Sequence, residues 1–370
     1  FSMQSEMKIM RLPYLSACCT VLLFVASDIS LAEETTDVSR SFQDDLTFLR
    51  SHTPTVLLEE GGAAVAVAPA YQGRVMTSTV DRNQGPSFGW INRKVIEAGL
   101  LSDEERKGKL EEHIYVFGGE ERFWLGPEGG QFALFFKPGT KFEFSDWTTP
   151  AAIDTEPFEL VRQTRSTAEF KRDCELTNYS GTKFNMGIQR TLRILDRVSI
   201  SKALQSDALP DTIKVVGYES DNRLTNRGNR AWTPETGLPS IWLLGMFNPS
   251  PQTTVVIPFK SGDESLLGPR VNDTYFGKVP PEYLTVENDV LFFRGDGTRR
   301  GKIGISAQRS KGIAGSYDAG GKVLTLVTYN VQPAPHGFVN SMWELQQNPY
   351  DGDVINSYND GSPAPGEPPL

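Results

Sequence analysis

The feature that most limits the fold is a period-two alternation of apolar and polar residues after residue 158. Segments 168–172, 174–178 and 184–195 all carry this pattern. A strand of this kind has one face toward a core and one toward water. Residues that favour turns separate the segments, and no long helical period follows residue 112. The pattern therefore predicts an all-β fold.

The order of the elements predicts how the strands pack. Strands do not alternate with helices, so we expect antiparallel sheets rather than a parallel α/β sheet. No fixed repeat or low-complexity linker divides the chain, which predicts one large antiparallel β-sandwich over residues 52–370, with a few short helices. Two helical segments are expected outside the strands: a helix over 37–51 capped by Ser41, and a helical or irregular stretch over 92–112 with a capping box at Ser102. Further expected strands are at 114–117, 131–136 and 141–144, with a strand and turn over 198–209.

The first part of the chain resembles a secretory leader. If translation starts at Met7, a short basic region precedes an apolar stretch over 12–26. Small residues at Ser30 and Ala32 suit a signal peptidase, and the stretch is too short for a spanning helix. We therefore predict a signal peptide over 7–32, a helical segment over 33–51, no transmembrane span, and a secreted or periplasmic protein.

Cysteine placement bears on the same question. Leu15 to Cys18 resembles a lipoprotein box, so a lipid anchor on Cys18 is an alternative to cleavage after Ala32. Cleavage after Ala32 would leave Cys174 alone, and no intrachain disulfide could form.

Charge and histidine content exclude several functions. The net charge is −9 with no cluster of Lys and Arg in the mature chain, which argues against a nucleic-acid partner. The three histidines, His52, His113 and His336, have no spacing typical of a zinc site. We therefore predict no metal site of this kind and no required cofactor.

The segment 117–136 combines paired glycines with aromatic, basic and acidic side chains. Trp124 offers a flat apolar face to a sugar ring, and Arg122 can bond hydroxyl groups. Alternate residues on a strand share a face, which would group Glu120 with Arg122 and Trp124. Glu120 and Glu128 are the predicted catalytic carboxyl groups, with Glu121 beside Glu128 as another pairing. A hairpin with core aromatics and an internal ion pair is the structural alternative.

Two further segments contain side chains suited to a polar ligand. Residues 335–361 are rich in Trp, Asn, Asp and Tyr, and residues 218–228 end in turn-forming residues. Turn chemistry, with Asx-turns, is the favoured structural explanation of both segments. The oxygen ligands in 351–360 also suit calcium, although their spacing is not that of an EF-hand. The ligand-binding candidates are Asn226, Trp343, Glu344, Asn356 and Asn359, and the calcium candidates are Asp351, Asp353, Asn359 and Asp360.

Four motifs, at 73–78, 117–131, 154–158 and 352–361, give the chain a family resemblance over roughly residues 50 to 370. It resembles an uncharacterised family of secreted bacterial proteins known as a domain of unknown function. That family is similar, more distantly, to the galactose-mutarotase-like β-supersandwich superfamily. The resemblance implies a supersandwich fold, a carbohydrate ligand and a role for Arg74 in ligand binding.

The same resemblance bears on catalysis. Aldose epimerases use two histidines and a late glutamate, and His113 and His336 are the possible counterparts here. Trp232 and Trp242 stand where such relatives place a histidine. Relatives also continue past Leu370 with a Glu-bearing strand, which would make this chain a C-terminal truncation. Simple mutarotase activity is not expected.

The combined hypothesis is a secreted protein that binds or processes a carbohydrate. If it is an enzyme, we expect a hydrolase, lyase or epimerase. The alternative is a non-catalytic glycan-binding or structural protein of the cell envelope.

The leader makes the first testable prediction. When the chain is expressed from Met7 in a bacterium, the mature protein should begin at Glu33, because the signal peptidase reads Ser30 and Ala32. N-terminal sequencing of the exported protein measures this. Cytosolic protein that retains the intact leader would contradict it.

Overall fold

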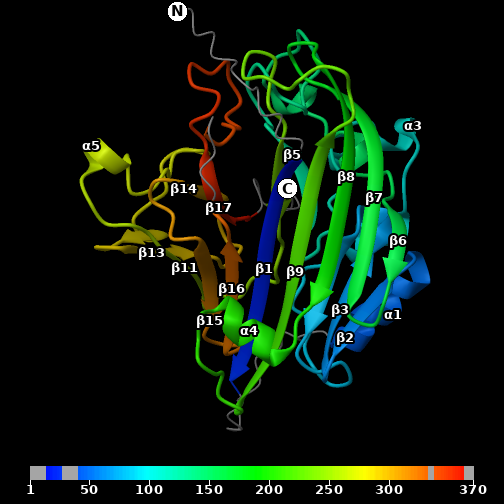
Figure 1. The fold of residues 1–370 in the computed structure, drawn as a ribbon, viewed down its shortest axis with the longest axis vertical. Coiled ribbons are helices and arrows are strands. Elements are labelled where there is room, and N and C mark those ends of the chain that lie inside the picture. The colour runs from blue at the N-terminus through cyan, green and yellow to red at the C-terminus, as the bar shows by residue number, and fades with distance from the viewer. Residues whose placement is uncertain (1–13, 27–40, 332–336, 362–370) are drawn as a thin grey trace, which may run out of the picture.

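A computed structural model describes residues 14–26, 41–331 and 337–361. As predicted, the chain is all-β with antiparallel sheets and a few short helices. Among the described residues the largest sheet has ten strands, and its long central strands lie side by side in Figure 1. In spatial order they are β12 (Leu284–Val286), β13 (Val290–Arg294), β11 (Thr253–Pro258), β15 (Ile313–Asp318), β16 (Val323–Tyr329), β1 (Tyr14–Ala26), β9 (Ile213–Asn226), β8 (Lys183–Ile194), β7 (Thr167–Thr177) and β6 (Glu159–Gln163).

Smaller sheets and helices pack around this large sheet. The strands are β2 (Val56–Glu60), β3 (Ala63–Ala68) and β4 (Arg74–Thr79) in one sheet, β5 (Arg122–Gly126) paired with β10 (Ser240–Leu244), and β14 (Gly301–Ser306) paired with β17 (Asp353–Asn359). The helices are α1 (Phe42–His52), α2 (Arg93–Ala98), α3 (Asp103–Arg106), α4 (Arg197–Ala203) and α5 (Glu264–Leu267), with 3-10 turns η1 (Pro69–Tyr71), η2 (Leu110–Glu112), η3 (Phe144–Asp146) and η4 (Ala151–Ile153).

Strand β3 shows how the layers pack. Both of its faces are buried, as its run of alternating Ala and Val indicates. Val65 and Val67 belong to the main core, which also holds apolar side chains of β7 and β8. Ala64 and Ala66 pack with apolar residues of α1, which lies on the outside of β2 and β3 in Figure 1. The small alanines allow the helix to approach the sheet closely.

Several local predictions need correction. Residues 198–209 begin in helix α4, whose Asp196 cap accepts a hydrogen bond from the Ser199 backbone, and are not a strand. The runs at 114–117, 131–136 and 141–144 are largely buried or irregular segments outside the named strands. A short apolar run looks the same in a strand and in a buried loop, so the pattern could not separate them. The Ser41 cap and the Ser102 capping box are confirmed.

The apolar N-terminal stretch has a place in the large sheet. The structure puts Tyr14–Ala26 as β1 between β9 and β16, antiparallel to both. The rest of the predicted leader lies outside the described residues, and cleavage stays a prediction. A chain processed at Ala32 would lack β1, and the edges of β9 and β16 would then need another partner. Over the described residues, helices that are long and apolar enough to cross a membrane are absent.

A buried ion pair joins the start of β5 to the large sheet. The guanidinium of Arg190 on β8 forms a two-pronged contact with the carboxylate of Glu121, with Nη1 2.9 Å from Oε1. Arg190 also donates to Asn222 Oδ1 at 2.6 Å and to the Gly73 carbonyl at 3.0 Å. The side chains of Arg190 and Glu121 are 0% and 3% exposed. All of this favours the structural alternative for Glu121, an internal ion pair.

This pair makes the second prediction. Arg190→Met should lower the free energy of unfolding by about 3–5 kcal/mol, because it leaves a buried carboxylate without a partner. Denaturant unfolding measures the loss. The control is Arg193→Met on the same strand, whose ion pair with Glu219 is 51% and 30% exposed and should contribute at most about 1 kcal/mol. Equal losses in the two variants would contradict the structural role of Arg190.

Candidate functional site

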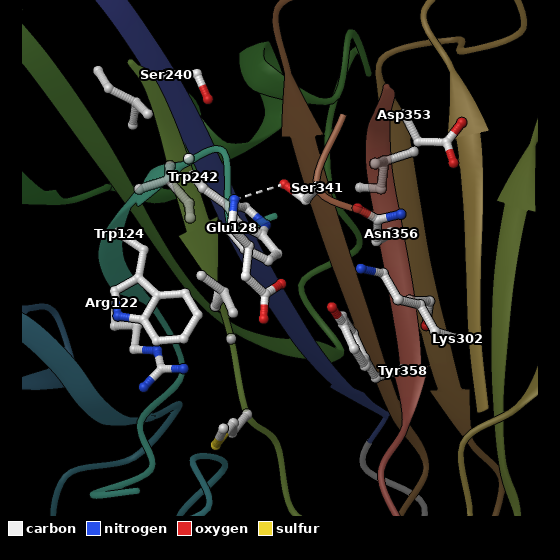
Figure 2. Close-up of a pocket in the computed structure, with 18 of the residues that line it drawn as sticks. Arg122, Trp124, Glu128, Ser240, Trp242, Lys302, Ser341, Asp353, Asn356 and Tyr358 are labelled. Atoms are coloured by element: carbon white, nitrogen blue, oxygen red, sulfur yellow. Dashed lines mark hydrogen bonds between the residues drawn. The ribbon is translucent and has the colours of Figure 1, made fainter. Parts of the chain in front are cut away.

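A large cavity lies between the β5–β10 pair and the β14–β17 pair. Its volume is about 2760 Å³ as bounded by the described residues. Typical small-ligand pockets measure roughly 300–1,000 Å³, so this one has room for a ligand of several rings. Figure 2 shows Arg122, Trp124 and Trp242 on one side, Lys302 and Tyr358 on the other, and Glu128 between them.

Strand β5 supplies the first wall. Trp124 lies opposite Trp242 of β10, with ring centroids 5.5 Å apart. The Arg122 guanidinium stacks over the Trp124 ring, 3.9 Å from its centroid. Arg122 is only 4% exposed, and its Nε and Nη1 have no hydrogen-bond partner among the described residues. Burial lowers the pKa of Arg122 to about 10, so the group remains a cation with unused donors.

A glycine places Glu128 beside a distant loop. A Cβ on Gly129 would lie 2.3 Å from the Met342 carbonyl oxygen, so only glycine allows this approach. The backbone N–H of Glu128 donates to Ser341 Oγ at 3.2 Å, the dashed line in Figure 2. Gln131 and Gln346 exchange two further bonds of 3.0 Å. These contacts bring Glu128 and Trp343 to the same part of the cavity.

The Glu128 carboxyl group has a perturbed acidity. Burial raises its pKa, while the Lys302 cation and the indole N–H groups of Trp343 and Trp147 oppose the rise. In Figure 2 the carboxylate points into the space that Lys302 and Tyr358 face from the other side. A carboxyl group with a raised pKa inside a cavity can both give and accept a proton nearer neutral pH.

Lys302 of β14 is the main residue of the second wall. It is 4% exposed, and its ammonium lies 4.2 Å from the Tyr275 ring centroid and 4.7 Å from that of Tyr358. Trp242 is a third ring at 5.6 Å. Burial lowers the pKa of Lys302, and the charges of Glu128 and Asp353 oppose this. Sequence reasoning missed Lys302, since a lone lysine in a strand carries no signal until β14 pairs with β17.

Neighbouring polar groups of this wall are already bonded to one another. Tyr275 donates its hydroxyl to Asp353 Oδ2 at 2.5 Å, and Asn272 donates to the same oxygen at 3.2 Å. Asn356 donates to the Tyr275 hydroxyl at 3.3 Å. Burial raises the pKa of both Asp353 and Tyr275. Asp353 is therefore an anchor for this wall.

The structure brings most of the predicted site residues to one cavity. Those that line it are His113, Glu120, Arg122, Trp124, Glu128, Asn226, Trp343, Glu344, Asn356 and Asn359. Two predicted residues do not join them. Arg74 is fully buried in the core and donates to the Gly118 carbonyl at 2.9 Å, a structural placement for a residue expected to bind ligand. His336 lies outside the described residues.

Not all of the lining residues point free groups at the cavity. His113 Nδ1 bonds the Trp147 carbonyl at 2.7 Å. Asn226 bonds the Gly228 and Arg230 backbone at 2.9 and 2.7 Å, as in an Asx-turn. Asn359 is 2% exposed and bonds Gly297 and Asp296, and Glu344 is exposed. His113, Asn226 and Asn359 therefore stabilise the cavity wall through these bonds, and Glu344 lies at its rim.

Three of the calcium candidates are hydrogen-bonded to other side chains. Asp351 accepts a bond from Asn340 at 3.0 Å, whereas Asp353 bonds Tyr275 and Asn359 bonds Asp296. Over the described part of the chain, no group of three or more His, Cys, Asp or Glu side chains could hold a metal ion.

Glu120 differs from Glu128 in its surroundings. It is 1% exposed, and its Oε1 accepts a hydrogen bond from the Ser78 backbone of β4 at 2.5 Å. Burial raises its pKa to about 7, while the bonds from Ser78, Tyr218 and Thr77 oppose the rise. These surroundings favour a structural role for the Glu120 carboxyl group over a catalytic one.

The third prediction concerns Glu120 and pH. A carboxyl group whose pKa is higher in the folded protein stabilises the fold at low pH. This contribution is lost as the pH rises from the ordinary glutamate pKa of 4.5 through the folded-state pKa of about 7. Glu120→Gln should therefore lose less stability than the wild type between about pH 5 and about pH 8. Denaturant unfolding at both pH values measures this. An identical pH dependence in the two proteins would refute it.

Comparison with known proteins identifies the family of this chain and several proteins of similar structure. No curated protein matches the sequence. A galactose mutarotase-like protein from Lactobacillus casei is similar in structure, with a TM-score of 0.42, 9% identity, and a match over 82% of this chain and 95% of that one. A galactose mutarotase related enzyme from Lactobacillus acidophilus has a TM-score of 0.33 and 9% identity, covering 82% and 92% of the two chains. A putative aldose 1-epimerase from Escherichia coli has a TM-score of 0.32 and 10% identity, covering 82% and 96%. Residues 40–370 match the family described as "Family of unknown function (DUF6786)", and the chain belongs to that family.

Proposed function

We propose that this protein binds a carbohydrate in the cavity between β5–β10 and β14–β17. One observation carries the proposal: aromatic side chains, two buried cations and a carboxyl group line a single cavity. The predicted leader would place this activity outside the cytoplasm. A purely structural envelope protein has no need for such a cavity.

Trp343 and Trp242 are partly exposed aromatic side chains of the cavity lining and suit sugar rings. Trp343 stacks on the buried Trp147 with centroids 6.0 Å apart, and Trp242 packs on the buried Trp124. Indole faces cover the apolar faces of sugars, while their N–H groups reach hydroxyl oxygens. Arg122 and Glu128 add a donor and an acceptor that can fix the orientation of a ligand.

The acidity of Glu128 favours a second candidate, in which the bound sugar is also processed. A carboxyl group with a raised pKa beside a buried cation is typical of general acid–base catalysis. Glu128 would then donate a proton to the sugar or accept one from it, and the Lys302 ammonium would stabilise the negative charge that develops on the ligand. A hydrolase, lyase or epimerase could each use this arrangement.

The fourth prediction tests binding. Trp343→Ala should weaken glycan affinity at least about tenfold, because it removes a flat apolar surface from the cavity. Calorimetry against the glycans that a panel screen of the full chain identifies measures this. The matched control is Leu345→Ala, two residues further along the same loop and 70% exposed, which should bind normally. Failure of the wild type to bind any glycan would overturn the proposal, as would unchanged affinity in Trp343→Ala.

Turnover separates the two candidates. Glu128→Gln keeps the shape of the side chain but cannot transfer a proton. If the wild type converts a bound glycan, this variant should bind it and fail to convert it. Binding without turnover by the wild type would identify a glycan-binding protein.

A further inference from the structure

Lys302 is a buried cation that forms no ion pair with any described carboxylate. Its side chain is 4% exposed, and its ammonium lies over the ring faces of Tyr275, Tyr358 and Trp242. Over the described residues its ammonium makes no hydrogen bond and no ion pair. Aromatic faces stabilise a cation by about 0.5–2 kcal/mol but accept none of its N–H bonds in the ordinary sense. Burial of an unpaired ammonium is costly.

The nearby carboxyl groups do not pair with Lys302. Asp353 accepts bonds from Tyr275 and Asn272 on the same oxygen. Burial raises the pKa of the Glu128 carboxyl group, which favours its neutral form. Both carboxyl groups influence Lys302 from a distance, yet neither forms an ion pair with it among the described residues. Because Lys302 also lines the cavity, a ligand bound there can approach its ammonium.

A second buried cation lies across the cavity. Arg122 has Nε and Nη1 without partners, and Figure 2 shows Arg122 and Lys302 on opposite sides of Glu128. A guanidinium offers a planar pair of donors that matches a carboxylate. The chain as a whole does not attract anions, because its net charge is −9. An anion site in this protein therefore needs positive groups at the site itself. The positive groups are local to the cavity.

We infer that the ligand is an acidic sugar, and that Lys302 binds its carboxylate, with Arg122 as a second anion-binding residue. The inference rests on the proposed carbohydrate function and adds the class of ligand: a glycan that contains uronic acid. A ligand with more than one carboxylate would contact both cations, and the size of the cavity allows this. Neutral sugars would leave the Lys302 charge buried and unpaired.

The test uses pairs of glycans that differ only in charge. Oligogalacturonides, oligoglucuronides and oligomannuronides are each compared with their methyl esters by calorimetry on the full chain. The wild type should bind at least one acid at least about tenfold more tightly than its ester, since one good charge-assisted contact contributes on the order of 1.4 kcal/mol. Lys302→Met should remove this preference, so that the acid and its ester bind equally well.

Two controls keep the result interpretable. Lys311→Met removes a partly exposed cation that pairs with Asp289 at 3.1 Å, and it should keep the preference for the acid. The thermal midpoint of Lys302→Met should equal or exceed that of the wild type, because the variant no longer buries an unpaired charge. Arg122→Gln is the second cavity variant and should weaken the preference partially.

Each remaining outcome decides between the two proposals. Equal affinity for acids and esters would overturn the acidic-sugar inference and leave carbohydrate binding intact. Binding of no sugar, acidic or neutral, would overturn both. A sulfated galactan serves as a further probe, and binding of it alone, lost in Lys302→Met, would overturn the assignment of a carboxylate.

Discussion

The buried contact between Arg190 and Glu121 positions the rest of the site. It fixes the residue just before β5 against the middle of the large sheet, where Arg190 also bonds Asn222 of β9. Such a pair has a narrow range of allowed geometries, because both charges must be matched away from water. Arg122 and Trp124 follow directly on β5. Their stacking on the cavity wall therefore depends on a contact outside the ligand-binding surface.

The opposite wall depends on strand pairing between distant parts of the chain. In the β14–β17 pair, Lys302 lies directly opposite Tyr358, and Gly304 opposite Asn356. Cross-strand neighbours are about 4.5–5.5 Å apart at Cβ, which explains why the ammonium meets the Tyr358 ring. The loop that precedes β17 reaches back to Gly129 and places Trp343 beside Glu128. Three segments far apart in sequence thus form one cavity.

The sequence predicts the sheets better than it predicts the site. Alternation identified β7 and β8, because one face of each must be dry and the other wet, but it gave no sign of β1. It failed for 131–136, which is apolar because it is buried and not because it pairs as a strand. Residue chemistry selected Glu128, Arg122 and Trp343, which line the cavity. It also selected Arg74, since a buried arginine that bonds backbone carbonyls has the same letter as one that faces a ligand.

Lys302 was missed for a related reason, and the other buried cations show what distinguishes it. Arg190 meets a carboxylate, and Arg309 donates to the carbonyls of Lys260, Gly262 and Gly268 at 2.7–3.2 Å. Each of these two groups uses its donors within the fold, so burial costs it little. Lys302 and Arg122 are equally enclosed, yet both line the cavity, and neither forms an ion pair among the described residues. Whether a buried cation stabilises the fold or binds a ligand depends on its partners and on whether it lines a cavity, and only the three-dimensional arrangement reveals both.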